Sequence, residues 1–327
     1  MGEPIVPEIC CVALLAGGTS AEREISLASG NGAEAALREA GFPIRRFDPA
    51  KPEDMKELAR AAANHEVQVA FLCLHGKGGE DGTIQATLEG MGLPYTGSGV
   101  EASRIAIDKN CAKCAYKRDG LPTSPWVYLE DSTVNRAKER GVLDLVLGKA
   151  TELLGEHVVV KAINQGSTQG LFIAESAVDL GKCVDEALNF DSSVIVEKFI
   201  AGDEFTVAVL GNDNPEALPV IQIVPKSGFY DFEAKYAPGG SKHLCPAPIS
   251  EELTAKLMDL AVKAHRALGC RGVSRTDFIV DADGQPWILE TNTIPGMTKT
   301  SLLPDAARVA GMSFPQLCTH LVELALE

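Results

Sequence analysis

The first hundred residues alternate between apolar runs and helical patterns, and this order constrains the fold more than any other feature. Strand-like runs and helical patterns follow one another at 9–15, 21–40, 43–47, 52–64, 67–74 and 83–91. Continuous apolar strands that alternate with helices are typical of a buried parallel sheet. The sequence therefore predicts an open α/β sheet, and ligands of such sheets bind beyond the carboxyl ends of the strands.

Two glycine-containing loops follow the first and third of these apolar runs. The loop at 17–20 leads into the helical pattern that has Glu22 near its start, and the loop at 76–82 follows His75. Both side chains are therefore expected at the binding end of the sheet. His75 could instead be an ordinary hydrogen-bonded residue at a strand end, but its place beside a glycine loop favours a functional role.

From about residue 104 the pattern changes to antiparallel signals. A helical pattern at 103–118 precedes strand-like runs at 126–129, 158–162, 171–175, 194–199 and 204–210. Only a Gly/Ser loop separates the second of these runs from the third, which is typical of a hairpin. The rest of the chain shows an irregular loop and two helical patterns, at 227–248, 251–268 and 314–324. These changes of pattern divide the chain into three predicted parts, at 1–103, 104–200 and 201–327, of which the first is an α/β domain.

The segment 274–292 has the pattern of a β-hairpin with polar side chains on one face. A two-residue turn at Asp283-Gly284 would create two facing pairs, Asp277 with Glu290 and Arg275 with Asn292. Two facing carboxylates repel each other unless a positive charge lies between them. Oxygen ligands of this kind suit Mg²⁺ or Mn²⁺ and leave coordination positions for substrate phosphates. We predict a divalent-cation site here, and the alternative is a solvated polar face.

Lys161 precedes a loop at 163–170 that is rich in Gly, Ser and Thr. Glycine lets the backbone approach a phosphate closely, and amide and hydroxyl groups donate hydrogen bonds to it. The loop does not match the P-loop pattern, and no G-x-G-x-x-G string follows the first strand. An ordinary flexible turn is the alternative for this loop alone. Its combination with the cation-site pattern favours phosphate binding.

Charge and cysteine content narrow the class of protein. The chain has 327 residues, with 30 Lys+Arg against 45 Asp+Glu and a formal net charge of −15. This balance argues against nucleic-acid and membrane-surface partners, because both need a positive field. No apolar run has the length of a membrane span, and the start lacks the cationic region of a signal peptide. Nine scattered Cys favour a reduced, cytoplasmic protein, and Cys111 and Cys114 alone do not make a zinc site.

Seven separated strings, in order, resemble the bacterial D-alanine–D-alanine ligases, a family of the ATP-grasp superfamily. They are LLAGGTSAEREISLASG at 14–30, LHGKGGEDGTIQATLEGMGLPYTGSGVEAS at 74–103, DK at 108–109, VVVK at 158–161, VEKFIAGDEFTVAVL at 196–210, FYDFEAKY at 229–236 and LETNTIPGMTKTSLLPDAARVAGMSFPQL at 289–317. The resemblance implies an ATP-grasp fold preceded by an N-terminal parallel-sheet domain, with ATP between the last two domains, both α+β. It also implies ATP-dependent ligation of two D-alanines through a D-alanyl phosphate, for peptidoglycan precursor synthesis, by a homodimer.

The resemblance also assigns nucleotide and metal roles. Two Lys would hold the nucleotide phosphates, Lys109 and Lys161. The adenine would be lined by Glu197, Lys198 and Ile200, and the ribose would meet Glu204. Two Mg²⁺ or Mn²⁺ ions would be bound by Asp277, Glu290 and Asn292, in agreement with the hairpin pattern. Lys235 would contact the transferred phosphoryl group.

On the amino-acid side, the resemblance implies that Glu22 takes the ammonium of the first D-alanine. Ser301 and the Leu302 backbone would take the carboxylate of the second, near His75. The tetrahedral oxyanion would be met by Arg275 and the Gly296 N–H, since a developing oxyanion needs hydrogen-bond donors. A triad of Glu22, Ser167 and Tyr236 would join the N-terminal domain to a lid at 227–248, which would keep water from the acyl phosphate.

The chain departs from the family pattern in two strings, at 161–170 and at 274–277. Gln165 stands where the family loop usually has Glu, which removes a negative charge near the phosphates, and Thr276 lies in the family's G-R-[IVA]-D string. We expect Thr276 to point away from the metal face. Tyr236 favours D-alanine as second substrate. A related ligase that uses D-lactate, D-serine or another amino acid, and a nucleotide-binding protein without ligase activity, are the alternatives.

Overall fold

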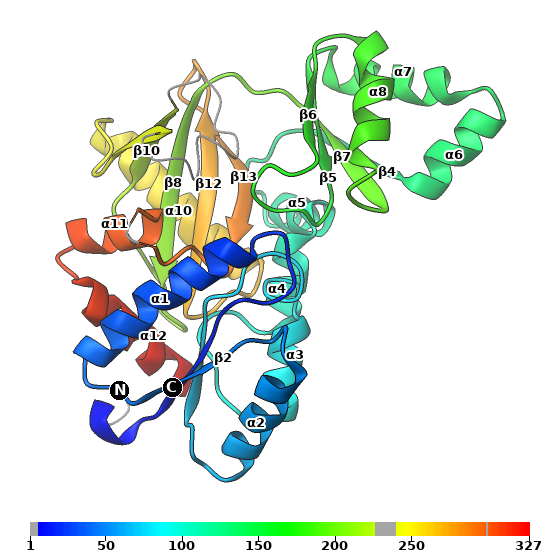
Figure 1. Ribbon diagram of the computed structural model, residues 1–327. Coiled ribbons are helices and arrows are strands. Elements are labelled where there is room, and N and C mark those ends of the chain that lie inside the picture. Colours follow the sequence, from blue (N-terminus) through cyan, green and yellow to red (C-terminus); the bar gives the residue numbers. More distant parts are fainter. Residues whose placement is uncertain (1–5, 226–239, 299) are drawn as a thin grey trace.

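The structure is a computed structural model that describes residues 6–225, 240–298 and 300–327. It contains three sheets (Figure 1). The first has the strand order β2-β1-β3 and is parallel throughout, with β1 at Val12–Leu15, β2 at Ile44–Phe47 and β3 at Val69–Leu72. Its helices are α1 at Arg23–Glu39, α2 at Pro52–Ala63 and α3 at Thr83–Gly90. The predicted parallel α/β sheet is confirmed, although β1 starts three residues late because Pro7–Ile9 form a 3-10 turn.

The two faces of the first sheet belong to different cores. Val12 and Leu14 pack with side chains of α1, while Ala13 and Leu15 pack with α2 and α3. The first face is also covered by the end of the chain, where α11 spans Leu302–Val309 and α12 spans Phe314–Leu326. The C-terminal helices therefore close the N-terminal sheet, and α12 lies against α1 (Figure 1). The predicted boundaries of the three domains stay a prediction.

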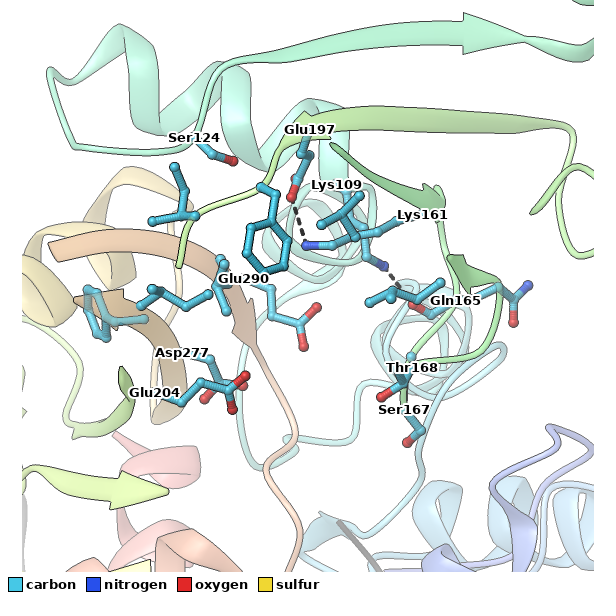
Figure 2. A pocket seen from close by; sticks show the side chains of 18 of the residues that line it. Lys109, Ser124, Lys161, Gln165, Ser167, Thr168, Glu197, Glu204, Asp277 and Glu290 are labelled. Atoms are coloured by element: carbon cyan, nitrogen blue, oxygen red, sulfur yellow. Dashed lines mark hydrogen bonds and ion pairs between the residues drawn. The ribbon is translucent and has the colours of Figure 1, made fainter. Parts of the chain in front are cut away.

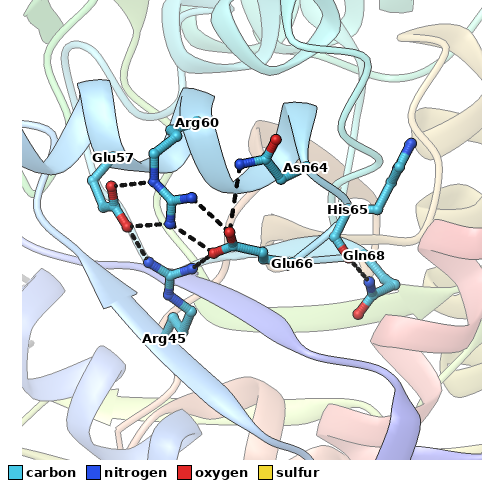
Figure 3. Close-up of polar contacts among 7 residues, drawn as sticks. All are labelled: Arg45, Glu57, Arg60, Asn64, His65, Glu66 and Gln68. Carbon is cyan, nitrogen blue, oxygen red and sulfur yellow. Dashed lines mark hydrogen bonds and ion pairs between the residues drawn. The ribbon is translucent and has the colours of Figure 1, made fainter.

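An exposed network of alternating charges ties α2 to β2 (Figure 3). Arg45 contacts Glu57 at 2.5 Å and Glu66 at 2.7 Å, and Arg60 contacts the same two carboxylates at 2.7 and 2.6 Å. Hydrogen bonds from Arg60 and then Arg45 lower the pKa of Glu57 to about 2, and the same two arginines lower that of Glu66 to about 2. Because these groups are exposed and salt screens them, the network adds little stability for each pair.

The helix predicted at 103–118 is two helices, and this part of the prediction is wrong. α4 spans Val100–Ile107 and α5 spans Lys109–Arg118, with Asp108 in an extended conformation between them. The Asp108 side chain accepts a hydrogen bond from Cys111 N at 2.8 Å, so it caps α5. The break places Lys109 in the first position of a new helix.

The second sheet is antiparallel, with the order β4-β7-β5-β6. Its strands are β4 at Trp126–Glu130, β5 at Val158–Ala162, β6 at Leu171–Ala174 and β7 at Ser193–Lys198. One face carries three helices, α6 at Asp131–Glu139, α7 at Leu143–Leu154 and α8 at Ala177–Ala187. The predicted hairpin around the Gly/Ser loop is confirmed, because β5 and β6 pair antiparallel.

The third sheet has the order β11-β10-β8-β12-β13, with β9 beside β8. Its strands are β8 at Asp203–Leu210, β9 at Glu216–Ala217, β10 at Ile221–Pro225, β11 at Ser241–Leu244, β12 at Val273–Val280 and β13 at Pro286–Asn292. The helix α10, Glu251–Ala267, packs on this sheet. The loop predicted at 227–248 contains β11, and its part up to 239 lies outside the described residues. No helix in the described ranges combines the length and apolar character that a membrane crossing needs.

The β12–β13 hairpin has the predicted partners but not the predicted turn. Its loop has three residues, 282–284, because Asp281 N donates to Gln285 O at 3.1 Å and Gly284 has a φ of +74°. A bulge between Asp277 and Phe278 then shifts the register by one residue. The two offsets cancel, so the observed pairs are Asp277 with Glu290 and Arg275 with Asn292.

Candidate active site

A cleft of about 980 Å³, open to solvent, lies between the second and third sheets (Figure 2). It brings together the residues predicted to bind nucleotide and most of the predicted metal ligands: Lys109, Lys161, Glu197, Lys198, Ile200, Glu204, Asp277 and Glu290. Their elements are the start of α5, strands β5, β7 and β8, and the β12–β13 hairpin. We call this space the nucleotide cleft.

A buried carboxylate lies at one wall of the nucleotide cleft. Glu197 is 3% exposed, and its oxygens lie 2.8 Å from Lys161 Nζ and 3.1 Å from Lys113 Nζ. Burial alone would raise the pKa of Glu197, but the positive charges of Lys113 and Lys161 lower it to about 2. Glu197 is therefore ionised at neutral pH. Sequence reasoning missed Lys113, although it follows Lys109 by one helical turn and shares its face of α5.

The loop at 163–170 closes the opposite wall. Lys109 Nζ donates to the backbone oxygen of Gln165 at 2.6 Å, which fixes the lysine against the loop. The Gln165 side chain donates to Phe190 O at 3.0 Å. Ser167 and Thr168 have φ of +50° and +64°, a left-handed conformation that costs energy outside glycine and is typical of functional loops. Thr168 Oγ1 is buried and has no hydrogen-bond partner among the described residues, so a ligand in the cleft can satisfy it.

Asp277 and Glu290 face each other across the hairpin at the border of the nucleotide cleft. Arg275 holds Asp277 through two hydrogen bonds of 2.9 and 2.8 Å, and Thr206 Oγ1 donates to the same carboxylate at 2.5 Å. Within the described residues, no group of three His, Cys, Asp or Glu side chains could hold a metal ion. Two carboxylates and the Asn292 amide fit Mg²⁺, which takes few protein oxygens and completes its shell with phosphates and water.

Thr276 points away from this face, as predicted. It is fully buried, and its hydroxyl lies 2.9 Å from that of Thr291, which in turn accepts from the Tyr116 hydroxyl at 2.8 Å. Thr276, which departs from the family's G-R-[IVA]-D string, therefore lies on the face of the hairpin that packs into the core.

A second cleft, of about 810 Å³, lies between the loops of the first sheet and the segment after β13. It collects the described residues predicted for the amino-acid substrates: Glu22, His75, Ser167, Arg275, Gly296, Ser301 and Leu302. Asn292 lines this second cleft and not the nucleotide cleft. The two clefts share Gly166, Ser167 and Glu290. We call this second space the amino-acid cleft.

Hydrogen bonds between distant loops build the amino-acid cleft. The Ser167 hydroxyl donates to the buried carboxylate of Glu22, and Ser20 Oγ donates to His75 O at 2.7 Å. Burial and the positive charge of Arg275 lower the pKa of His75 to about 4, so the ring is neutral at pH 7. Its Nε2 lies 3.2 Å from Ser29 Oγ. Two members of the predicted triad, Glu22 and Ser167, are therefore in contact. The third member, Tyr236, and the predicted phosphoryl contact, Lys235, lie outside the described residues.

Glu80 is a second residue that sequence reasoning missed. It lines the amino-acid cleft beside Glu22, and its carboxylate accepts from Gly76 N at 2.7 Å. Burial, followed by the negative charge of Glu22, raises the pKa of Glu80. The sequence signal for Glu80 was its place in the 76–82 glycine loop, which directly follows His75.

The far end of the amino-acid cleft is the start of α11. Ser301 is the N-cap residue, and its Oγ accepts from Thr298 N at 3.0 Å. A Cβ at Gly296 would lie 2.8 Å from Ser301 Oγ, so glycine is what lets the two segments approach. Free N–H groups and the helix dipole make such an N-terminus suited to a carboxylate.

Comparisons with known proteins point to one family. Residues 45–98 match the family described as D-ala D-ala ligase N-terminus, and residues 115–323 match D-ala D-ala ligase C-terminus. The chain is 45% identical to the D-alanine--D-alanine ligase of Desulforamulus reducens, over 97% of this chain and 98% of the relative. It is 46% identical to that of Desulforudis audaxviator, with the same coverage.

Solved structures give the same result. The D-alanine--D-alanine ligase from Bacillus anthracis has a TM-score of 0.81 at 31% identity, and the alignment covers 97% of each chain. The same enzyme complexed with ATP has a TM-score of 0.79 at 29% identity, with equal coverage. The fold is therefore the predicted ATP-grasp fold behind an N-terminal parallel-sheet domain. One family description matches more than half of the chain, and the relatives are similar over nearly its full length. The chain therefore belongs to the D-alanine–D-alanine ligase family.

Proposed function

We propose that this protein joins two D-alanines to D-alanyl-D-alanine and converts ATP to ADP and phosphate. The observation that carries the proposal is the junction of the two clefts at Gly166, Ser167 and Glu290. A nucleotide in one cleft and an amino acid in the other would meet at these residues. The dipeptide product serves peptidoglycan precursor synthesis. The reaction is an ADP-forming carbon–nitrogen ligation.

The nucleotide cleft binds ATP. Its base lies against Glu197, Lys198 and Ile200, and its ribose meets Glu204. Lys109 and Lys161 neutralise the phosphates, since both lie at the cleft wall near the 163–170 loop. Phosphoryl transfer needs positioning and charge neutralisation more than covalent chemistry, and these lysines supply both. Lys235 is proposed to contact the transferred group.

Two Mg²⁺ or Mn²⁺ ions are held by Asp277, Glu290 and Asn292. When bound, they neutralise developing charge on the phosphate oxygens. The protein's own part is to keep the ligands on one face of the hairpin, which the bulged β12–β13 register does. Arg275, on the same strand, and Thr206, on the neighbouring strand β8, orient Asp277 through hydrogen bonds.

The amino-acid cleft orients both D-alanines. Glu22, held by Ser167, takes the ammonium of the first, and Tyr236 completes this triad. Ser301 and the Leu302 N–H take the carboxylate of the second, with His75 beside it as a neutral hydrogen-bonding group. The second substrate's identity as D-alanine, and not D-lactate or D-serine, is part of the proposal.

The reaction has two steps. The carboxylate oxygen of the first D-alanine attacks the γ-phosphorus, ADP leaves, and D-alanyl phosphate forms. The amine of the second D-alanine then attacks the carbonyl carbon, the C–O bond to phosphate breaks, and one proton is lost. Arg275 and the Gly296 N–H stabilise the tetrahedral oxyanion between these events. The 227–248 segment is proposed as the lid that excludes water from the acyl phosphate.

The test is an ATP-dependent product assay with Mg²⁺ and D-alanine, D-lactate or D-serine as acceptor. We expect phosphate release that depends on D-alanine and a mass-spectrometric product of two D-alanines. A D-lactate or D-serine adduct as the main product would replace the acceptor assignment. No phosphate release with any acceptor, despite ATP binding, would leave a nucleotide-binding protein without ligase activity.

Three further properties belong to the same proposal. The enzyme forms a homodimer and works in the cytoplasm, where ATP is available, and its chain divides into domains at 1–103, 104–200 and 201–327. Sedimentation equilibrium of the full chain gives the subunit number, and a mass of one chain at assay concentration would contradict the dimer.

A further inference from the structure

Lys113 is the most deeply buried lysine of the described chain that no substrate role accounts for. It lies in α5 with 1% of its side chain exposed, four residues after Lys109. Its ammonium donates to Thr123 Oγ1 at 2.7 Å and to Ser124 Oγ at 3.0 Å, and it lies 5.3 Å from the centre of the Trp126 ring. A buried ammonium is costly unless it is paired and hydrogen-bonded, and here Glu197 supplies the counter-charge at 3.1 Å.

Glu197 Oε1 has acceptor capacity left beyond its ion pair with Lys113. This oxygen is buried and has no hydrogen-bond partner in the described part of the chain, although Lys113 Nζ lies 3.1 Å away as an ion pair. The other oxygen is paired with Lys161. Because Glu197 lines the nucleotide cleft, a donor on the ligand can satisfy this oxygen.

The two lysines at Glu197 are not equivalent. Lys161 is 13% exposed and lines the cleft, so nucleotide phosphates compete with Glu197 for its charge. Lys113 is shut off from solvent and fixed by Thr123, whose own hydroxyl donates to Ile288 O at 3.1 Å. Lys113 therefore remains at Glu197 whatever the phosphates do.

We propose that Lys113 is a positioning residue that keeps Glu197 ionised and oriented to accept from the 6-amino group of a purine. Lys113 thereby sets the preference for ATP over 6-oxopurine nucleotides. This inference rests on the proposed function and deepens its nucleotide site. An ionised carboxylate accepts from a 6-amino group but opposes a 6-oxo group, whereas a protonated carboxyl can donate to the 6-oxo group.

The charged groups around Glu197 set the expected pH behaviour. Lys113 faces it from α5 and Lys161 from β5, while Glu204 and Glu290 act on Lys161. Removing Lys113 takes away the positive charge that lowers the pKa of Glu197 most, so that pKa rises. The protonated fraction of Glu197 then increases as the pH falls, and discrimination against the 6-oxo group weakens most in acid.

The test compares wild type, Lys113→Met and Lys113→Gln with ATP and with ITP, which carries a 6-oxo group. We expect Lys113→Met to raise the KM for ATP about tenfold or more and to lower the ATP/ITP ratio of kcat/KM by a similar factor. Both changes should be larger at pH 6 than at pH 8, and the KM for D-alanine should change little. Lys117→Met is the matched control, because Lys117 lies one turn further along α5, is exposed and also lies near Trp126, at 5.8 Å.

Two further variants guard the test against misfolding and against an effect that does not pass through Glu197. Lys113→Gln retains hydrogen-bond donors but no charge, so it carries the test if Lys113→Met does not fold. In Glu197→Gln, adding Lys113→Met should shift the ATP/ITP ratio no further, since the group that Lys113 acts through is gone. A folded Lys113 variant with a wild-type KM for ATP and an unchanged ATP/ITP ratio at both pH values overturns the inference, even if its melting temperature falls.

Failure of the proposed function has a different signature. In that case the wild-type protein releases no phosphate with any acceptor. Calorimetric binding of ATP and ITP, without amino acid, still reports whether Lys113→Met alters base preference.

Discussion

The nucleotide cleft and the amino-acid cleft share a border but are built in different ways. The nucleotide cleft is walled by strands of two sheets and by one helix start, and its charges lie in short local patterns. The amino-acid cleft is walled by loops and element ends from all three sheets, together with the segment that leads into α11. A polyanion can be held by repeated cations on regular elements, whereas a small zwitterion needs opposite charges from several distant segments.

The two clefts also differ in the charged side chains that line them. Three lysines, Lys109, Lys161 and Lys198, line the nucleotide cleft together with four carboxylates, whereas Arg275 lines the amino-acid cleft together with Glu22, Glu80 and Glu290.

The border residue Glu290 should show the largest effect. Glu290→Gln keeps the shape but removes a charge that both clefts use, so we expect turnover to fall by about 1,000-fold or more. Phosphate release at saturating ATP, Mg²⁺ and D-alanine measures it. Asp283→Asn, in the exposed hairpin loop, is the control that should behave like wild type. Activity of Glu290→Gln within tenfold of wild type would remove Glu290 from the metal assignment.

Glu22 tests whether the amino-acid cleft can fail alone. Glu22→Gln loses the charge opposite the substrate ammonium, and we expect the KM for the first D-alanine to rise about 100-fold. ATP affinity, measured by calorimetry without D-alanine, should not change. Glu24→Gln, on the exposed side of the same helix start, is the matched control. A parallel loss of ATP affinity would show that the two clefts do not work separately.

Asp48 supports the loops of the amino-acid cleft from behind. It pairs with Arg23 at 2.6 Å and accepts from Gly18 N at 2.9 Å, and mainly through Arg23 its pKa is lowered to about 2. A lowered carboxyl pKa stabilises the fold above the unfolded pKa, and this contribution disappears as the pH falls toward the folded pKa. Asp48→Asn should therefore cost about 1 kcal/mol at pH 7, after allowance for the partial exposure of Arg23, and less below about pH 4.

Urea unfolding of Asp48→Asn and wild type at pH 7 and pH 3.5 measures this difference. Identical midpoints at pH 7 would mean that the ion pair does not stabilise the loop.

Gln165 should show the smallest effect. Lys109 binds the backbone oxygen at this position, which any residue provides, and the Gln165 side chain faces Phe190 O. Restoring the family residue with Gln165→Glu should thus change the KM for ATP by less than about threefold. Steady-state kinetics at two salt concentrations checks it. A larger, salt-dependent increase would mean that the side-chain charge reaches the phosphates.

The nucleotide cleft was the more predictable of the two from sequence. Its hairpin pairs, its glycine loop and Lys161 appear as local patterns, and the pairing of Asp277 with Glu290 survived a wrong turn because a bulge compensated. The helix break at Asp108 was missed, since a capping Asp inside a helical pattern has no distinct spacing signal. In the amino-acid cleft, Glu80 was missed because its burial depends on segments from elsewhere in the chain.

The sequence by itself determined that the first sheet is parallel and which side chains share a face of the β12–β13 hairpin, because the alternation of side chains along a strand is local. Only the tertiary structure decided that α12 closes the first sheet and that Lys113 lies beside Glu197. These contacts join residues far apart in the chain. Their energies come from burial and charge pairing in the folded molecule, which no short window of sequence contains.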